Sequence, residues 1–476
     1  MPHASSSNMG KSPNDSRYPN GWHMDDRMPH HDSFQQLWET KWKDPCSKGI
    51  YPFMFGFIQD FQPIVEDIIA KGLKEPYNWD EYASCFFGTA EQLGQMAAVA
   101  QQEGDTDKAR DCYLRASAVY RIARFPIPRS PLQKLAWQKG KEMFYLGASL
   151  MEYPIHEVLI PHIHALPSSS EEGSVIPVNL LIPPTATPTS PCPLVLIMTG
   201  LDGYRTELAV WQRGWLDKGV ATLVVEIPGT GDSPALPQDP QSPDRQWSSV
   251  LDFISQHQPR IDKQKIIVWG FSTGGYYAFR IAHTHASRLL GSVSLGGGCH
   301  HMFDREWLDK VNNLEYPFDL ADTLAYKFGY APTKEGLEQF KKEGQAKFSL
   351  LVDGTLAKAD TEGCCKNVLL VNGEWDRIFP VEDLTLALKF GGIKSKPKEA
   401  RIVSEKWHMG EPESFVVILR WIHELLGLDG DWMGQLKGWG LKPSDVSRYV
   451  YDGVGGDDYS IKVFGISEGK LRRGRC

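Results

Sequence analysis

The hydrophobic pattern of the chain changes its period once, near residue 153. Between Ser33 and about Leu150, apolar and small residues recur every three or four positions, which is the spacing of one face of an amphipathic helix. Gly104 interrupts this pattern, and Asp105, a residue type that caps helices, follows it. The sequence therefore predicts an α-helical region up to about residue 150, with a pair of helices joined at Gly104.

Beyond residue 153, short apolar runs alternate with helical stretches. The runs expected to form strands are residues 156–166, 175–182, 194–198, 222–227, 266–269, 291–295, 368–371 and 400–403. The first two are expected to form a hairpin. The later runs are apolar throughout, which is typical of parallel strands that are covered on both faces. The sequence therefore predicts an α/β fold with a mostly parallel sheet.

This alternation breaks between Met302 and about Val352, where the chain is helical and rich in lysine. We interpret residues 302–352 as a helical lid inserted between two strands. Four parts of the chain are expected: a leader over 1–31, an α-helical cap domain over 32–152, a catalytic domain over 153–427 and a C-terminal extension over 428–476. The leader is polar and the extension is rich in glycine, so we expect the leader to be disordered and the extension to be loosely packed.

Composition and charge exclude several classes of protein. Lys and Arg number 51 against 59 Asp and Glu, and this net charge of −8 argues against a nucleic-acid binder with a basic surface. No apolar run reaches the roughly 18 residues of a membrane span, and the polar N-terminus lacks the apolar core of a secretory signal. The eight cysteines are scattered without a C-x-x-C pair, which is typical of reduced thiols. We therefore expect a cytoplasmic protein.

A G-x-S-x-G motif follows the strand expected at 266–269. It reads Gly270-Phe-Ser272-Thr-Gly274, and a helical stretch comes after it. In α/β-hydrolases this turn between a strand and a helix is too tight for side chains beside the serine, and it holds the serine hydroxyl above the sheet. The motif therefore predicts that Ser272 is a catalytic nucleophile. The alternative is a chance match.

A serine hydroxyl is a weak nucleophile and needs a base that is held by an acid. In the α/β-hydrolase fold these residues follow in the order serine, acid, histidine, in loops after the late strands. Asp376 follows the strand at 368–371, and His408 follows the strand at 400–403. We assign Asp376 as the acid, in preference to Glu374 in the same loop, and His408 as the base. The alternatives are a helix cap for Asp376 and a packed loop histidine for His408.

Acyl transfer also needs two N–H groups that stabilise the developing oxyanion. The backbone of Thr273, directly after the nucleophile, is expected to supply one. Leu201, in the glycine-containing loop after the strand at 194–198, is expected to supply the other. The residues expected to contact the substrate are Asp202, Tyr204, His300 and His301. For the two histidines, which stand where the lid begins, the alternative is a solvated loop.

Two further patterns carry weaker signals. Residues 226–233 form a glycine-containing turn after a strand, but they lack the Lys-Ser/Thr ending of a phosphate-binding Walker motif. His162 and His164 share one face of a strand without an evident third ligand. We therefore expect no metal site and no cofactor.

Several blocks of the sequence resemble one known family, the fungal yellowish-green pigment hydrolases. The resemblance runs from about Trp38 to about Leu426. The matching blocks are Trp38–Lys43, Cys46–Lys48, Met198–Arg205, Glu226–Thr230, Ser242–Arg245, Val268–Tyr277, Ala282–His285, Asn313–Phe318 and His408–Gly410. Thr273 stands where the resemblance leads us to expect alanine, and the C-terminal extension has no counterpart.

The resemblance implies an α/β-hydrolase core with an N-terminal helical cap. It also implies that the protein shortens an aromatic polyketide by hydrolysing a C–C bond in melanin or pigment biosynthesis, as when a heptaketide naphthopyrone becomes tetrahydroxynaphthalene. Similar proteins act in fusarin and cytochalasan-type pathways, so the fold does not fix the substrate. The alternatives are a carboxylesterase or thioesterase with the same triad, and a non-catalytic scaffold. The sequence does not decide whether the protein forms a homodimer.

Overall fold

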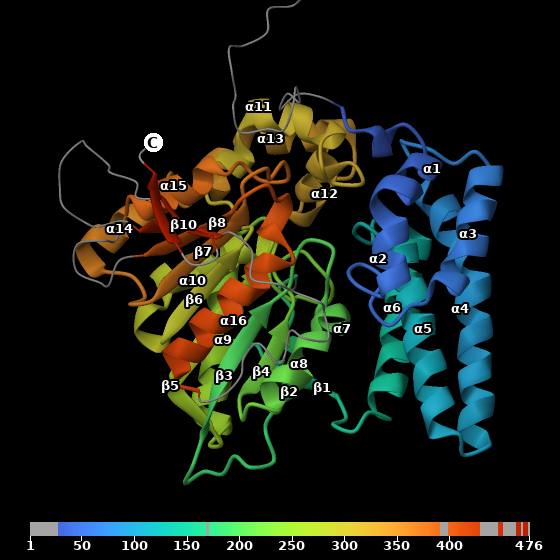
Figure 1. Cartoon of the computed structure of the whole chain (residues 1–476), viewed down its shortest axis with the longest axis horizontal. Coiled ribbons are helices and arrows are strands. Elements are labelled where there is room, and N and C mark those ends of the chain that lie inside the picture. The colour runs from blue at the N-terminus through green and yellow to red at the C-terminus, as the bar shows by residue number, and fades with distance from the viewer. Residues whose placement is uncertain are drawn as a thin grey trace, which may run out of the picture.

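The structure is a computed structural model, and it describes residues 27–167, 171–390, 398–428, 446–450, 463–467 and 470–474. Its centre is an eleven-stranded sheet in the order β1-β2-β4-β3-β5-β6-β7-β8-β9-β10-β11. The cap helices α1 to α6 gather on one side of the sheet domain, and the lid helices α11 to α13 lie at the top of the view (Figure 1). Across the described ranges, every helix falls short of the length and hydrophobicity of a transmembrane segment.

The strands follow the apolar runs of the sequence. The first eight are β1 (Glu157–Pro161), β2 (Val175–Leu181), β3 (Cys192–Met198), β4 (Ala221–Val225), β5 (Ile261–Phe271), β6 (Gly291–Leu295), β7 (Val368–Gly373) and β8 (Glu399–Val403). Strands β3 to β8 pair in parallel, whereas β1 and β2 add an antiparallel edge. The predicted α/β fold with a mostly parallel sheet is confirmed. The loops that leave the carboxyl ends of these parallel strands meet at one edge of the sheet.

Alternate residues of the central strands pack into two apolar cores. On one face of the sheet, Val195 and Ile197 of β3 pack with α8 and α16. On the other face, Leu194, Leu196 and Met198 belong to a core that includes α9 and α10 and continues into the cap and the lid. The helices of this domain are α7 (Arg205–Leu208), α8 (Val210–Leu216), α9 (Ser242–His257), α10 (Thr273–Thr284), α14 (Thr355–Glu362), α15 (Glu382–Leu388) and α16 (Glu413–Leu426).

Six helices precede the sheet domain. They are α1 (Phe34–Leu37), α2 (Lys43–Lys48), α3 (Ile58–Ala70), α4 (Trp79–Gln102), α5 (Thr106–Arg124) and α6 (Pro131–Ala148), and a π-helical turn covers Trp38–Trp42. Helices α4 and α5 form the hairpin expected around Gly104. The Asp105 side chain accepts a hydrogen bond from the N–H of Lys108 (3.1 Å) and so caps α5.

Buried ion pairs join the cap to the sheet domain. Arg121 and Arg124 of α5 both bind Glu207 of α7 at 2.8 Å, and no side chain of this group is more than 2% exposed. Arg121 also donates to the carbonyl oxygens of Pro52 (3.0 Å) and Met54 (2.8 Å). The charges at this junction are therefore paired and hydrogen-bonded, as buried charges need to be.

The lid attaches through aromatic rings and one buried amine. Its helices are α11 (Arg305–Lys310), α12 (Leu320–Lys327) and α13 (Lys334–Phe348). Lys327 is fully buried; its amine contacts the hydroxyl of Tyr277 and lies 3.7 Å from the ring centroid of Phe328. Phe328 belongs to a cluster of rings with Phe303, Phe340 and Phe348.

The glycine turn after β4 touches the lid through main-chain atoms. Gly229 has a φ of +77°, and a Cβ at this position would lie 1.8 Å from the carbonyl oxygen of Lys327. A side chain would therefore collide with the end of α12. The glycine-containing turn at residues 226–233 therefore packs against the end of lid helix α12.

The leader ends earlier than predicted. His30 and His31 are only 2% and 3% exposed, and their Nε2 atoms lie 3.2 Å and 2.8 Å from the carbonyl oxygens of Tyr316 and Leu314. The prediction of disorder is wrong for residues 27–31, because these imidazoles are buried by hydrogen bonding to the lid backbone. Residues 1–26 lie outside the described residues.

The C-terminal extension adds strands to the sheet. The antiparallel strand β9 (Val446–Val450) pairs with β8, and β10 (Val463–Ser467) and β11 (Lys470–Gly474) continue the sheet. β9 pairs with backbone groups that β8 would otherwise leave unpaired at the sheet edge, and the loose packing of the extension stays a prediction. The rest of the extension beyond residue 428 lies outside the described residues.

Candidate active site

Ser272 sits at the sharp turn between β5 and α10. Its φ of 52° and ψ of −120° are angles that residues other than glycine rarely adopt. A Cβ at Gly270 would lie 2.1 Å from the carbonyl oxygen of Gly274, and a Cβ at Gly274 would lie 2.2 Å from that of Thr199. Both glycines are therefore required by the turn, which carries the Ser272 hydroxyl at the carboxyl edge of the sheet.

The structure brings His408 and Asp376 to Ser272. Nε2 of His408 lies 2.8 Å from Oγ of Ser272, and Nδ1 lies 2.8 Å from Oδ2 of Asp376. The other carboxylate oxygen of Asp376 accepts hydrogen bonds from the N–H groups of Ile378 (2.7 Å) and Phe379 (3.1 Å). An acid fixed in this way can orient an imidazole, and the imidazole can then take a proton from the serine.

Glu374, the alternative candidate for the acid, forms its hydrogen bonds away from His408. Oε2 of Glu374 accepts hydrogen bonds from the hydroxyl of Ser404 and the N–H of Glu405, both at 3.0 Å. Asp376, in contrast, is 1% exposed and lies against the base. The structure therefore pairs Asp376, and not Glu374, with His408.

Several carboxylates surround the imidazole of His408. Burial acts to lower the pKa of His408, but the charge and hydrogen bond of Asp376 oppose this effect. Glu315 and Glu411 add negative charge, so that the pKa of His408 is raised above its ordinary value. Burial raises the pKa of Glu411 to about 7, and it also raises the pKa of Glu315, which faces Lys41 of the cap. A raised pKa makes the neutral imidazole a stronger base toward the Ser272 hydroxyl.

Leu201 and Thr273 lie beside the nucleophile. A Cβ on Gly200, the residue before Leu201, would lie 3.6 Å from Cβ of Ser272. Thr273 is the first residue of α10 and follows Ser272 directly. Among the described residues, neither backbone N–H has a protein acceptor. These two N–H groups are thus without a protein acceptor in the described part of the chain, and their binding of an oxyanion stays a prediction.

Residues 84–426 match the sequence profile of esterases described as FrsA-like, and this range covers most of the chain. The chain belongs to the FrsA-like esterase family. Esterase FrsA of Yersinia pestis (strain Pestoides F) is 27% identical over 318 residues, which are 63% of this chain and 68% of that protein. Esterase FrsA of Yersinia pseudotuberculosis serotype O:1b (strain IP 31758) gives the same values.

Solved structures show the same fold as this chain. The 2,6-dihydroxy-pseudo-oxynicotine hydrolase matches with a TM-score of 0.56 at 19% identity, covering 78% of this chain and 93% of that chain. Wild-type AbyA5 matches with a TM-score of 0.57 at 20% identity, covering 80% and 95%. The chain therefore has the α/β-hydrolase fold that the sequence predicted, and its family is one of hydrolases.

Asp202 and Tyr204 lie against the cap. The carboxylate of Asp202 accepts hydrogen bonds from the hydroxyls of Tyr51 (2.6 Å) and Tyr316 (2.7 Å). Tyr204 is fully buried, and its ring packs edge-on against Trp137 with centroids 5.0 Å apart. A contact between either residue and the substrate stays a prediction.

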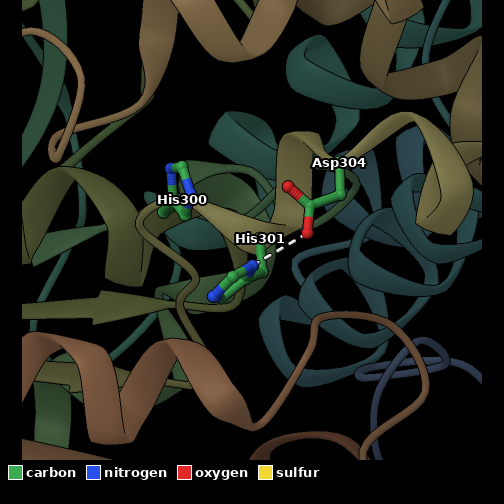
Figure 2. Close-up of side chains that lie close together, drawn as sticks. All are labelled: His300, His301 and Asp304. Atoms are coloured by element: carbon green, nitrogen blue, oxygen red, sulfur yellow. Dashed lines mark hydrogen bonds and ion pairs between the residues drawn. The ribbon is translucent and has the colours of Figure 1, made fainter.

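His300 and His301 gather with Asp304 where the lid begins (Figure 2). Nδ1 of His301 lies 2.8 Å from Oδ2 of Asp304, and Nδ1 of His300 lies 2.7 Å from Oγ of Ser349. The backbone N–H groups of both histidines donate to Asp383, which fixes their loop. One ligand atom from each of the three clustered side chains lies within 4.8 Å of the others, so this group could hold a metal ion. Their contact with substrate stays a prediction.

Cap and lid residues that the sequence did not single out also border the site. Glu315 of the lid accepts hydrogen bonds from the N–H groups of His408 (2.9 Å) and Arg377 (3.0 Å). Lys41, on the π-helical turn of the cap, lies 5.7 Å from the ring centroid of Trp407. The blocks at 38–43 and 313–318, which resemble the pigment hydrolases, contain these residues. Block similarity is the signal that could have found them.

Proposed function

We propose that this protein is a serine hydrolase in which Ser272, Asp376 and His408 form the catalytic triad. The observation that carries this proposal is the hydrogen-bonded path from Asp376 through His408 to Ser272, with 2.8 Å at each step. The carboxylate orients the imidazole and stabilises the imidazolium that forms. Membership in an esterase family supports the same chemistry.

In the proposed reaction, His408 takes the proton of Ser272 while the serine oxygen attacks a carbonyl carbon of the substrate. The N–H groups of Leu201 and Thr273 stabilise the tetrahedral oxyanion. When the intermediate collapses, the bond to the leaving group breaks and its electron pair departs with that group, which takes the proton from Nε2 of His408. Water, deprotonated by the same histidine, then attacks the acyl group and releases it from Ser272 as a carboxylic acid.

We further propose that the bond cleaved is a C–C bond of an aromatic polyketide. The leaving group is then a carbon whose electron pair is delocalised into a polyphenol or a β-diketone, and His408 protonates that carbon. The side chain of His408 is only 8% exposed, which limits competition from water and supports delivery to carbon of the proton that the imidazole has taken from Ser272. The similarity to pigment hydrolases supports a heptaketide naphthopyrone as the substrate and tetrahydroxynaphthalene, a melanin precursor, as the product.

The second candidate is a carboxylesterase or thioesterase, which the family match favours. Attack on the carbonyl is the same step in both cases. The difference lies in the leaving group, because an oxygen or sulfur leaving group does not need a proton delivered to carbon. The choice between the two candidates therefore depends on the product and not on the triad.

A direct comparison of kcat/KM for a heptaketide naphthopyrone and for a matched aryl ester tests the choice. We expect the larger value for the naphthopyrone, together with a short keto acid identified by mass. A preference for the ester without release of the acid would place the protein among ordinary esterases. Ser272→Ala is the control, because products that persist in this variant do not come from the triad.

A further inference from the structure

Asp202 is the point where the cap, the lid and the loop after β3 meet. Its two carboxylate oxygens accept hydrogen bonds from Tyr51 of the cap (2.6 Å) and Tyr316 of the lid (2.7 Å). These tyrosines are 265 residues apart in the sequence, yet they donate to the same side chain. The loop between them is the one that carries Leu201, a proposed oxyanion donor.

The loop after β3 is a tight turn that lies close to Ser272. The N–H of Gly200 donates to the carbonyl oxygen of Gly203 (3.1 Å), which closes the turn around Leu201 and Asp202. A Cβ at Gly200 would lie 3.6 Å from Cβ of Ser272, and a Cβ at Gly203 would lie 3.2 Å from the ring of Tyr51. A displacement of Asp202 would therefore be passed to the N–H of Leu201, because only one peptide unit separates them.

Both tyrosines are held in place by other parts of the chain. Arg121 donates to the carbonyl oxygen of Pro52, the residue after Tyr51, and to that of Met54. The carbonyl oxygen of Tyr316 lies 3.2 Å from Nε2 of the buried His30. The backbone that carries each tyrosine is therefore hydrogen-bonded to another part of the chain, which helps to hold its hydroxyl at Asp202.

We propose that Tyr51 and Tyr316 are positioning residues that hold Asp202, and through it the N–H of Leu201, in the arrangement that stabilises the oxyanion. This inference rests on the proposed serine hydrolase function, but not on the nature of the bond cleaved. Neither tyrosine touches the reacting atoms. The two hydroxyls make the oxyanion site depend on the cap and the lid together, since each cover supplies one of the two hydrogen bonds.

A positioning role and a substrate-binding role predict different kinetics. A residue that acts on the oxyanion stabilises the transition state, so its loss lowers kcat and leaves KM nearly unchanged. A residue that only binds substrate raises KM when it is lost. A small aryl ester such as p-nitrophenyl acetate distinguishes the two roles, because it is too small to reach distant subsites but still needs the oxyanion donors.

The test compares Tyr51→Phe, Tyr316→Phe and the double variant with wild type. These changes remove only the hydroxyls and keep the rings. We expect each single variant to lower kcat on the ester about tenfold, with KM within about twofold, and the double variant to lower it further. The rate at which a fluorophosphonate labels Ser272 should fall by a similar factor, because the phosphonyl oxygen occupies the same site.

Matched controls and a second variant keep the test decisive. Tyr330→Phe removes a hydroxyl that donates to Glu343 (2.7 Å) within the lid, and Tyr113→Phe removes one that donates to Gln101 (2.9 Å) within the cap. Both should keep wild-type kcat. Asp202→Asn should reproduce the loss if the tyrosine variants prove too unstable to measure, because an amide offers a single acceptor oxygen.

The outcomes separate this inference from the proposed function. A raised KM with unchanged kcat, or labelling at the wild-type rate in the double variant, overturns the positioning role. If the fluorophosphonate does not label Ser272 in wild type, the serine hydrolase proposal fails instead. A wild type that is labelled and hydrolyses only esters leaves the positioning role intact and rejects C–C cleavage.

Discussion

The cap and the lid both border the carboxyl edge of the sheet, but they attach to the sheet domain through opposite kinds of contact. At the cap, Arg121 and Arg124 share the carboxylate of Glu207, and the three side chains are almost fully buried. At the lid, Lys327 is buried with its amine 3.7 Å from the ring centroid of Phe328, and its contact is the hydroxyl of Tyr277. No carboxylate in the described part of the chain pairs with this lysine.

This difference teaches how each cover responds to the loss of a charge. Removing one member of a buried ion pair leaves the other without compensation, which is strongly destabilising. Replacing a buried amine that has no charged partner takes away the cost of desolvating or deprotonating it, which is stabilising if the volume is kept. Replacing one buried ionisable side chain by a neutral one should therefore lower the free energy of unfolding at the cap and raise it at the lid.

The largest expected effect is on activity, and it comes from substitutions in the proposed triad that leave the cap and the lid unchanged. Ser272→Ala and Asp376→Ala should each lower kcat/KM on an aryl ester by at least about 10³-fold, and Ser272→Ala should keep the wild-type Tm. Glu374→Gln is the matched control, since that carboxylate binds Ser404 and not His408. Near-normal activity in Asp376→Ala, with a loss in Glu374→Gln, would reverse the assignment of the acid.

The next effect is at the cap junction. Glu207→Gln should lower the free energy of unfolding by about 3 kcal/mol, because two buried arginines lose their shared charge. Urea denaturation followed by circular dichroism measures this change. Glu152→Gln is the control, because its pair with Arg213 is more than 60% exposed on both sides and should contribute less than about 1 kcal/mol. Equal effects of the two changes would contradict the comparison.

A smaller effect of opposite sign is expected at the lid. Lys327→Met, made together with Tyr277→Phe so that no hydroxyl is left without its contact, should raise the free energy of unfolding by about 1–2 kcal/mol at pH 7. Burial holds the pKa of Lys327 well below its ordinary value of 10.5. The unfolded chain therefore binds a proton that the folded chain releases, so wild-type stability should rise with pH between the folded and the unfolded pKa.

The double variant should lose this rise. Unfolding by urea at several pH values between neutrality and pH 10 measures it, with Tyr277→Phe alone as the reference. A wild type whose stability does not increase with pH in this window, or a double variant that is less stable than the reference, would show that the lysine has a compensating partner.

The smallest expected effect is on the pH dependence of kcat/KM, and it comes from Glu411, which belongs to neither the cap nor the lid. Glu411 lies on the loop after His408 and contributes to the raised pKa of the imidazole. The base must be neutral to accept the proton of Ser272, so Glu411→Gln should shift the acid limb of kcat/KM to lower pH, by about half a unit. Glu424→Gln, an exposed change on α16, should leave the limb in place. A shift to higher pH would contradict the electrostatic assignment.

The sheet and the positions of the triad could be predicted because their signals are local. The strands are continuous apolar runs, and Ser272 lies in a motif whose glycines are imposed by a turn of five residues. Asp376 and His408 follow from the rule that the loops after parallel strands share one edge of the sheet. Each of these inferences needs only a short window of sequence and a general property of the fold.

The contacts of the cap and the lid could not be predicted in this way. Tyr51 and Tyr316 meet only because two segments far apart in sequence are packed on the same loop. The burial of His30 and His31 depends on carbonyl groups of the lid, which no local pattern reveals, and a polar stretch of this kind is normally disordered. Strand β9 was missed because its pairing partner is the edge of β8, and sheet edges are a property of the topology.

The main-chain contact between Gly229 and Lys327 limits how this protein can diverge. Any residue with a side chain at position 229 would push on the end of α12, since the space for a Cβ is filled by a carbonyl oxygen 1.8 Å away. Homologues that have lost this glycine should therefore carry a lid that is shorter or differently seated. The residue at position 229 of the sheet domain should therefore indicate, in related proteins, whether the lid is built as it is here.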